Sequence, residues 1–232
     1  MLPTMASKNE ILPINRARGM LFIVSGPAGA GKGTICNTLK QLVPGIHLSI
    51  SATTRSPRRS EQHGIDYVFV SRDQFEKMIA DNELLEWAEI CGNFYGTPRA
   101  LIDQLLTGGQ DVLLEIDVQG AAQIKEMYPD AIMVFVMAPS LSELEQRLQN
   151  RGSDSAETIQ NRIALANREL QHVHDYDYLL INSVIQTAVE DLKAIIQAEG
   201  CRVSRQKIEW FKTREGDSSG EKTFNGGAYE NG

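Results

Sequence analysis

The chain has 232 residues, 42% of them hydrophobic, so it is long enough to bury a substantial core, and it contains no apolar run long enough to cross a membrane. A net charge of −7 argues against nucleic-acid binding as its main role. The cysteines, Cys36, Cys91 and Cys201, are far apart and lack C-x-x-C spacing. This usage favours a reduced, cytoplasmic protein without a disulfide framework or a zinc site.

The first predicted element is a buried strand. Residues 1–18 lack the apolar stretch of a signal peptide, and we expect them to form a flexible leader. The run Leu21–Val24 is short, continuous and apolar, which predicts a strand covered on both faces. Helical spacing of Ile35, Leu39 and Leu42 predicts a helix a few residues later.

Between this strand and this helix lies a glycine-rich loop, GPAGAGK, at residues 26–32. It matches G-x-x-x-x-G-K, a pattern that binds phosphate when a strand precedes it and a helix follows. The glycines allow successive backbone N–H groups to point at an anion, and the start of the helix adds its positive dipole end. Lys32 supplies a mobile charge for the outer phosphates.

One position departs from this pattern. The residue after the lysine is normally Ser or Thr, whose hydroxyl holds magnesium, but here it is Gly33, followed by Thr34. Either Thr34 takes this role from one position further along, or the metal is held by water and other groups. The sequence GKGT is similar to the loop of adenylate kinases, where glycine is normal.

The segment that follows is predicted to be an insertion rich in β structure. Alternation predicts a strand over His47–Thr53, followed by a polar loop with three arginines at residues 54–60. Short β segments are expected at Asp66–Val70, Leu84–Ile90 and Asn93–Tyr95, with a helix starting near Ser71. We therefore expect an insertion over about residues 50–100, in which Trp87 packs in the core.

The second half of the chain alternates strands and helices. Continuous apolar runs predict core strands at Asp111–Ile116, Ala131–Met137 and Tyr178–Ile181, which suits a parallel sheet covered on both faces. The helices are expected at Gln119–Met127, after Pro139-Ser140, at Ala156–His172 and at Val184–Ala198. Gly152–Ser155 is expected to be a polar hinge, Arg202–Trp210 to add a turn or two, and Thr213–Gly232 to be disordered. The fold class predicted from the residues is α/β.

The charged residues outside the phosphate loop fit phosphoryl transfer. Glu115 and Asp117 end a core strand, where a carboxylate can organise a hydrated metal. Arginines lie in the insertion and in the later helices, at Arg55, Arg58, Arg147, Arg151 and Arg162. No Ser-His-Asp set is apparent, and His172 and His174 are expected on the surface. If the acceptor is already ionised, no base is needed, and mobile arginines can neutralise two polyanions and exclude water.

With these motifs assembled, the chain resembles guanylate kinases from about Gly19 to Lys207. The resemblance is carried by six motifs in order: SGPAGAGKGT (25–34), SATTRSPR (51–58), GIDYVFV (64–70), ELLEWAEICGNFYGTPR (83–99), LLEIDVQGA (113–121) and RLQNRG (147–152). It implies a three-layer α/β/α P-loop core with a parallel sheet over 19–212. Within this domain it implies a GMP-binding insertion over about 50–100 and a helical lid over about 140–172.

The resemblance also implies roles for individual residues. ATP would be bound by Gly26, Pro27, Ala28, Gly29, Ala30, Gly31, Lys32, Gly33 and Thr34. GMP would be bound by Arg55, Arg58, Tyr67 and Tyr95 at its phosphate, and by Ser51, Glu86, Thr97 and Asp117 at its base. The residues expected to serve catalysis are Lys32, Arg55, Arg147, Arg151 and Arg162. Mg²⁺ would accompany ATP, with Thr34 or Glu115 reaching it through water.

Physical chemistry agrees with a guanine site at Glu86. Guanine presents N1–H and N2–H₂ as adjacent donors, and one carboxylate can accept both, whereas adenine would leave a buried carboxylate unpaired. The expected reaction is ATP + GMP = ADP + GDP, serving purine nucleotide metabolism and GMP recycling. The expected partners are these small molecules, without nucleic acid or membrane, and the sequence leaves the choice between monomer and homo-oligomer open.

Two alternatives remain at this point. The GKGT loop permits another nucleoside monophosphate kinase, although Glu86 and Asp117 argue against it. Guanylate-kinase-like domains of scaffold proteins bind partner proteins without catalysis, but such domains usually have a damaged phosphate loop. Here Gly26, Gly29 and Lys32 are intact.

Overall fold

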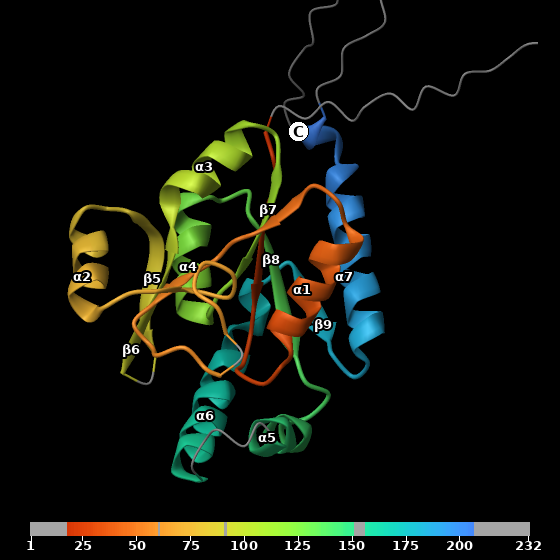
Figure 1. The fold of residues 1–232 in the computed structure, drawn as a ribbon. Helices are drawn as coiled ribbons and strands as arrows, with labels where there is room; N and C mark the ends of the chain where they lie inside the picture. Colours follow the sequence, from red (N-terminus) through yellow and green to blue (C-terminus); the bar gives the residue numbers. More distant parts are fainter. Residues whose placement is uncertain (1–17, 60, 91, 151–155, 207–232) are drawn as a thin grey trace, which may run out of the picture.

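The computed structural model describes residues 18–59, 61–90, 92–150 and 156–206. Its main sheet is parallel and has the strand order β2-β7-β1-β8-β9 (Figure 1). The strands are β1 (Leu21–Ser25), β2 (Ile46–Leu48), β7 (Asp111–Glu115), β8 (Ile132–Met137) and β9 (Tyr178–Ile181). The predicted hinge and tail lie outside the described residues, as does the predicted leader except for Arg18.

Helices cover both faces of this sheet, which gives three layers (Figure 1). One face carries α1 (Lys32–Leu42) and α7 (Ile185–Gly200), and the other carries α3 (Arg99–Thr107) and α4 (Val118–Met127). Because side chains alternate along a strand, Phe22 and Val24 of β1 pack on the first face, and Leu21 and Ile23 pack on the second. Both faces are therefore apolar, which explains the continuous apolar run of this strand.

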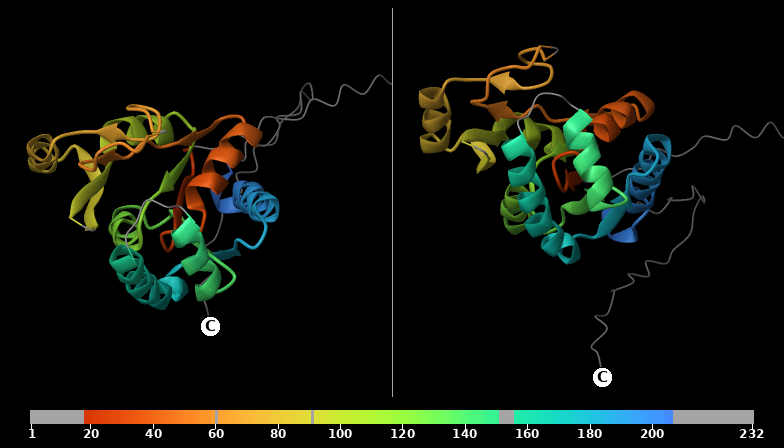
Figure 2. Two further views of the ribbon diagram at one scale, coloured as in Figure 1. Left: turned by 60° about the horizontal axis from the view of Figure 1, so that its bottom comes forward. Right: turned by 90° about the horizontal axis from the view of Figure 1, so that it is seen from below.

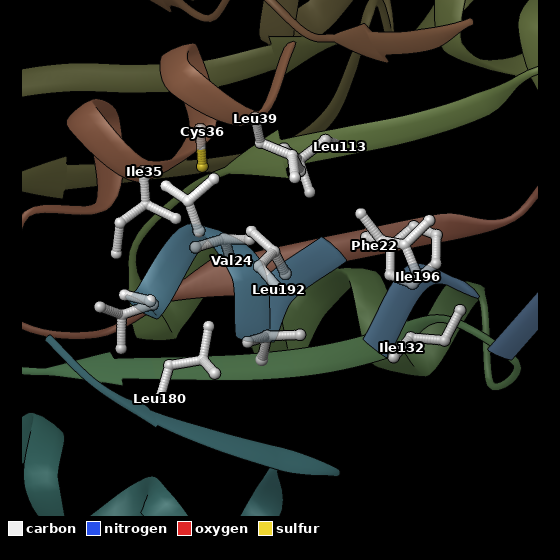
Figure 3. Packing of buried hydrophobic residues seen from close by; sticks show 14 of the residues in the cluster. Phe22, Val24, Ile35, Cys36, Leu39, Leu113, Ile132, Leu180, Leu192 and Ile196 are labelled. Atoms are coloured by element: carbon white, nitrogen blue, oxygen red, sulfur yellow. The ribbon is translucent and has the colours of Figure 1, made fainter. Parts of the chain in front are cut away.

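The α1–α7 side of the core is closely packed. Figure 3 shows Ile35 and Leu39 of α1 and Leu192 of α7 gathered over Val24 and Leu113 of the sheet. All of these side chains are fully buried. The helix that follows the phosphate loop is thus fixed by the central core, and so is the loop that leads into it.

The predicted insertion forms a separate small sheet with the strand order β4-β3-β6-β5. Its elements are β3 (Ala52–Thr53), β4 (Val68–Phe69), α2 (Arg72–Ala80), β5 (Leu84–Ile90) and β6 (Asn93–Pro98). Its core is small, and its centre is Phe75 of α2 stacked on Phe94 of β6 at a centroid distance of 5.3 Å. Ser71 begins α2 with a capping box to Gln74, as expected of a serine before an apolar-periodic run.

Two predictions about this region were wrong. The expected strand His47–Thr53 is divided: Ile46–Leu48 pairs with β7 in the main sheet, whereas Ala52–Thr53 pairs in the small sheet. Alternation cannot reveal that a chain leaves one sheet for another within three residues. Trp87 is not a core residue, since it is 39% exposed, and its ring meets that of Phe94 in an edge-on arrangement.

A pair of helices, α5 (Leu141–Asn150) and α6 (Ala156–Glu169), lies side by side beyond the main sheet and apart from the insertion (Figure 2). Leu144 and Ala166 are buried between them. The predicted helix Ala156–His172 ends at Glu169 and continues as a 3₁₀ helix, η1 (Leu170–Asp175), and Val203–Arg205 is a separate 3₁₀ turn. His172 and His174 are exposed, as predicted. Within the described ranges, none of the helices has the length and apolarity needed to span a membrane.

Candidate active site

A cleft of about 270 Å³ opens at the carboxyl ends of β1 and β7, where open parallel sheets place their ligands. It is shared by the phosphate loop, the insertion and α6. The predicted site residues that line it are Gly26, Pro27, Ala28, Gly29, Gly31, Lys32, Gly33, Ser51, Arg55, Arg58, Tyr67, Glu86, Tyr95, Glu115, Asp117 and Arg162. Residues that are up to 136 positions apart in the sequence thus face one cavity.

The backbone of the phosphate loop requires its glycines. Gly26, Gly29 and Gly31 all have positive φ, between 94° and 129°. A Cβ at Gly26 would lie 2.1 Å from the carbonyl oxygen of Val136, and one at Gly31 would lie 2.2 Å from Nδ2 of Asn182. The loop therefore keeps its shape only without side chains at these positions.

Asn182 hydrogen-bonds to the phosphate loop, and the sequence did not predict this contact. Its Nδ2 donates a hydrogen bond of 2.8 Å to the carbonyl of Ala30, which is fully buried and does not line the cleft. The Asn182 carbonyl in turn accepts a hydrogen bond of 2.9 Å from Nη2 of Arg147. The position of Asn182 directly after a predicted core strand is the signal that could have revealed it.

The predicted basic residues differ in where they lie. Lys32 donates from Nζ to the carbonyl oxygens of Gly26 and, at 3.2 Å, of Pro27, so its charge rests over the loop. Arg162 of α6 lines the cleft. Arg147 does not; its Nε donates to Glu143 of the same helix at 3.0 Å. Arg151 lies outside the described residues.

Glu115 and Thr34 flank the position where the phosphate-loop pattern departs from the rule. A Cβ at Gly33 would lie 3.3 Å from both oxygens of the Glu115 carboxylate. Thr34 is exposed and faces an adjoining hollow that Gly33 and Glu115 also line. Within the described residues, no group of three or more His, Cys, Asp or Glu side chains could hold a metal. One carboxylate and one hydroxyl still fit Mg²⁺, which retains several waters and uses few protein ligands.

The insertion contributes two arginines and two phenols to the cleft. The guanidinium of Arg55 lies 5.4 Å from the centre of the Tyr67 ring, and Tyr67 meets Tyr95 edge-on with a centroid distance of 6.2 Å. Burial raises the pKa of Tyr67 to about 12, so its hydroxyl remains a neutral donor. Arg58 lines the same part of the cleft. Cations and O–H donors converging in this way suit an anion with several oxygens.

Glu86 is a buried carboxylate of the cleft whose two oxygens have different neighbours. It is 5% exposed, and its Oε1 accepts a 2.7 Å hydrogen bond from the hydroxyl of Thr97, which is fully buried behind it. A Cβ at Gly120 would lie 2.3 Å from Oε2. Burial, together with the nearby charge of Asp117, raises the pKa of Glu86 to about 7, although the Thr97 hydrogen bond acts in the opposite direction.

Asp117 has a structural role as well as a place in the cleft. Its Oδ1 accepts a 2.7 Å hydrogen bond from the backbone N–H of Gly120 and caps α4, whereas Oδ2 is buried without a partner in the described structure. Burial raises its pKa. Because a buried oxygen without a donor is costly, Oδ2 is available to a donor supplied by a ligand.

Glu169 is a cleft residue that the sequence interpretation missed. It lies at the end of α6, where its Oε2 is buried without a partner in the described structure, and burial raises its pKa to about 7. It is seven positions after Arg162, a spacing that puts both residues on one face of a helix. That spacing was readable from the sequence, but nothing in it distinguished Glu169 from a solvated acid.

Comparison with known proteins identifies the family. A model described as guanylate kinase matches residues 18–199. The chain belongs to the guanylate kinase family. It is 50% identical to a guanylate kinase of Desulfitobacterium hafniense over 81% of this chain and 94% of that protein, and 48% identical to one of Clostridioides difficile over 84% and 97%. A crystal structure of guanylate kinase from Anaplasma phagocytophilum aligns with TM-score 0.70 and 32% identity over 83% of this chain and 92% of that one.

These findings confirm the predicted family and fold class. The parallel sheet with helices on both faces is the predicted P-loop α/β core, and the chain is a kinase. The relatives are matched over nearly their whole length, so the family assignment covers the core, the insertion and the paired helices together.

Proposed function

We propose that this guanylate kinase family member transfers the γ-phosphoryl group of ATP to GMP, giving ADP and GDP. The observation that carries the proposal is the shared cleft, in which a phosphate loop faces a buried carboxylate, Glu86, and the Arg55–Arg58–Tyr67–Tyr95 group. The phosphate loop suits the phosphates of a donor nucleotide, and the Glu86 carboxylate suits guanine. The arginines and tyrosines suit the phosphate of the acceptor. ATP and GMP are accordingly the proposed partners, and the cytoplasm the proposed compartment.

The proposed guanine contacts follow from the charge of the Glu86 carboxylate and from the N–H donors of guanine. Oε2 of Glu86, ionised, would accept from guanine N1–H and N2–H₂, with Asp117 and Ser51 beside it. Thr97 would hold Glu86 from behind rather than touch the base, since it is fully buried. Adenine at this place would leave the carboxylate without donors, which costs a few kcal/mol.

The proposed transfer needs no general base. An oxygen of the ionised GMP phosphate attacks the γ-phosphorus, a new P–O bond forms, and the bond to the bridging oxygen breaks so that its electron pair leaves with ADP. The loop amides and Lys32 would stabilise charge on the donor, and Arg55 and Arg58 would stabilise charge on the acceptor. Arg162, with Arg147 and Arg151 of the lid proposed over about 140–172, would exclude water on closure.

A magnesium ion is part of the proposal. Glu115 and Thr34 would reach it through ordered water, beside Gly33. When bound, the ion neutralises charge on the nucleotide phosphates. The insertion over about 50–100 would carry GMP, and the whole unit over 19–212 would act in purine nucleotide metabolism and GMP recycling.

A coupled assay for ADP release tests the proposal with GMP, AMP, UMP and dGMP, with and without Mg²⁺. We expect turnover with GMP, a loss of at least about 100-fold with AMP, and none without the metal. Turnover with AMP equal to that with GMP would reassign the acceptor. Tight partner binding without any turnover would favour the scaffold alternative.

A further inference from the structure

Glu61 is the acidic residue of the insertion that contacts both cleft arginines, and neither the motifs nor the proposed reaction gives it a role. Its carboxylate forms a paired hydrogen bond with Arg55: Nη1 donates to Oε2 and Nη2 donates to Oε1, both at 2.9 Å. The two side chains are only 13% and 16% exposed. A planar two-point pair in a largely buried place fixes the orientation of a guanidinium.

The same carboxylate orders the neighbouring arginine. The backbone N–H of Arg58 donates to Oε2 at 2.7 Å, and Nη1 of Arg58 lies 3.7 Å from Oε1. The backbone N–H of Glu61 donates in return to the carbonyl of Arg58 at 3.0 Å, which closes a tight turn. One side chain thus determines both the backbone at Arg58 and the side chain of Arg55.

Glu61 contacts the arginines from outside the main cleft. Arg55 and Arg58 line the main cleft together with Tyr67 and Tyr95. Glu61 does not; it lines an adjoining hollow, to which Arg58 and Tyr67 also contribute. Its carboxylate is therefore placed to hold the arginines without occupying the space in front of them.

Counting donors shows which edge of Arg55 remains for a ligand. A guanidinium has five N–H groups. Glu61 accepts two of them, and the carbonyl of Ser56 accepts another from Nη1 at 2.8 Å. Glu61 and Ser56 leave two N–H groups, on Nε and Nη2, which share the side-on edge of the guanidinium; the Tyr95 hydroxyl also interacts with Arg55. That edge has the geometry for two-point binding of a phosphate.

From this geometry we infer that Glu61 is a positioning residue that holds Arg55 and Arg58 ready for the phosphate of the acceptor nucleotide. The inference rests on the proposed function for the identity of that nucleotide. The negative charge of Glu61 repels a phosphate dianion, so the gain from ordering the arginines must outweigh this repulsion. Freezing a free arginine on binding costs up to about thirtyfold in affinity, and Glu61 removes this cost in advance.

The test compares GMP with guanosine, which lacks the phosphate, by calorimetry on the full chain. Glu61→Gln should weaken GMP binding about 10- to 30-fold and leave guanosine binding within twofold. The Michaelis constant for GMP should rise with it, while kcat at saturating GMP changes little. The control is Glu76→Gln, which breaks an exposed 3.0 Å ion pair with Arg72 on α2 and should change the affinity for neither GMP nor guanosine.

A double-mutant cycle with Arg55→Lys separates positioning from general damage. If Glu61 acts through Arg55, the two substitutions together should weaken GMP binding scarcely more than Arg55→Lys alone. Additive effects, unchanged or tighter GMP binding in Glu61→Gln, or an equal loss for guanosine would each overturn the inference. Should Glu61→Gln fail to fold, Glu61→Asp withdraws the carboxylate by one methylene and serves the same comparison.

Inorganic phosphate keeps this test independent of the proposed reaction. Its binding can be followed by NMR through the arginine Nε–Hε signals of the wild-type chain and of Glu61→Gln. A wild type that does not phosphorylate GMP would refute the proposed function, but weaker phosphate binding in Glu61→Gln would still support the positioning role. Equal phosphate binding in both proteins would contradict it.

Discussion

The phosphate loop and the insertion line the same cleft but hold their ligand groups differently. The loop is proposed to bind phosphate through backbone N–H groups, and its shape follows from glycines packed against Val136 and Asn182 of the central core. The insertion presents side chains, namely carboxylate, guanidinium and phenol, from a small sheet with its own limited core. A backbone site recognises any phosphate, whereas a side-chain site can select one base and one charge.

This difference indicates how substitutions on the two sides should behave. A change in the loop should affect every reaction of the enzyme, because all of them use the same donor phosphates. A change in the insertion should affect the acceptor selectively and leave nucleotide binding at the loop intact. The predictions below test that division, beginning with the largest expected effect.

Lys32→Ala should reduce turnover by about 10³-fold or more, because it removes a full positive charge from the proposed transferring group. The fold should be retained, since the hydrogen bonds of the Lys32 ammonium within the described residues go to the loop carbonyls of Gly26 and Pro27. ADP release and thermal melting measure the two effects, with the exposed Lys77→Ala as control. Full activity in Lys32→Ala would remove the loop from the chemistry.

Glu86→Gln should lower kcat/KM for GMP on the order of 100-fold, because a neutral amide offers guanine one weaker acceptor and an opposing N–H₂ group. The Michaelis constant for ATP should change less than threefold. Glu89→Gln on the exposed side of the same strand is the matched control. Equal losses for GMP and ATP would mean that Glu86 does not belong to a base site.

Gly120→Ala should raise the Michaelis constant for GMP about tenfold, because a methyl group there would lie 2.3 Å from Oε2 of Glu86 and displace it. Alanine favours a helix more than glycine does, so α4 itself should not suffer. Gly108→Ala at the end of α3, where a Cβ has no neighbour nearer than 3.4 Å, should leave GMP kinetics unchanged. No effect of Gly120→Ala would show that Glu86 adapts freely.

The pH dependence of stability is the smallest expected effect. The pKa of Glu86 is about 7 in the folded protein, against an ordinary value of 4.5, so the folded state binds this proton more tightly than the unfolded chain. Ionisation of Glu86 therefore lowers stability as the pH rises from 4.5, and the full cost applies above 7. Glu86→Gln should raise the melting temperature at pH 8 by a few degrees and less at pH 5. A larger gain at pH 5 would contradict this sign.

Local sequence pattern was sufficient to predict the phosphate loop and the elements that flank it. The strand Leu21–Ser25, the loop and the start of α1 follow from apolar run, glycine spacing and helical periodicity, all within one stretch of chain. The insertion was predicted less well, because its strands are short and pair across long separations. Nothing local separates Ile46–Leu48 from Ala52–Thr53, although they belong to different sheets.

The sequence by itself determined the α/β class and the phosphate loop, because glycine, lysine and apolar spacing act over a few neighbouring residues. Its six motifs carried the resemblance to the guanylate kinase family. Only the tertiary structure decided how Glu86 hydrogen-bonds to Thr97 and packs against Gly120, and how Glu61 pairs with Arg55 and Arg58. It also brought Glu169 into the cleft and left Trp87 partly exposed. Burial and side-chain pairing depend on which segments pack together, and that is a property of the whole chain.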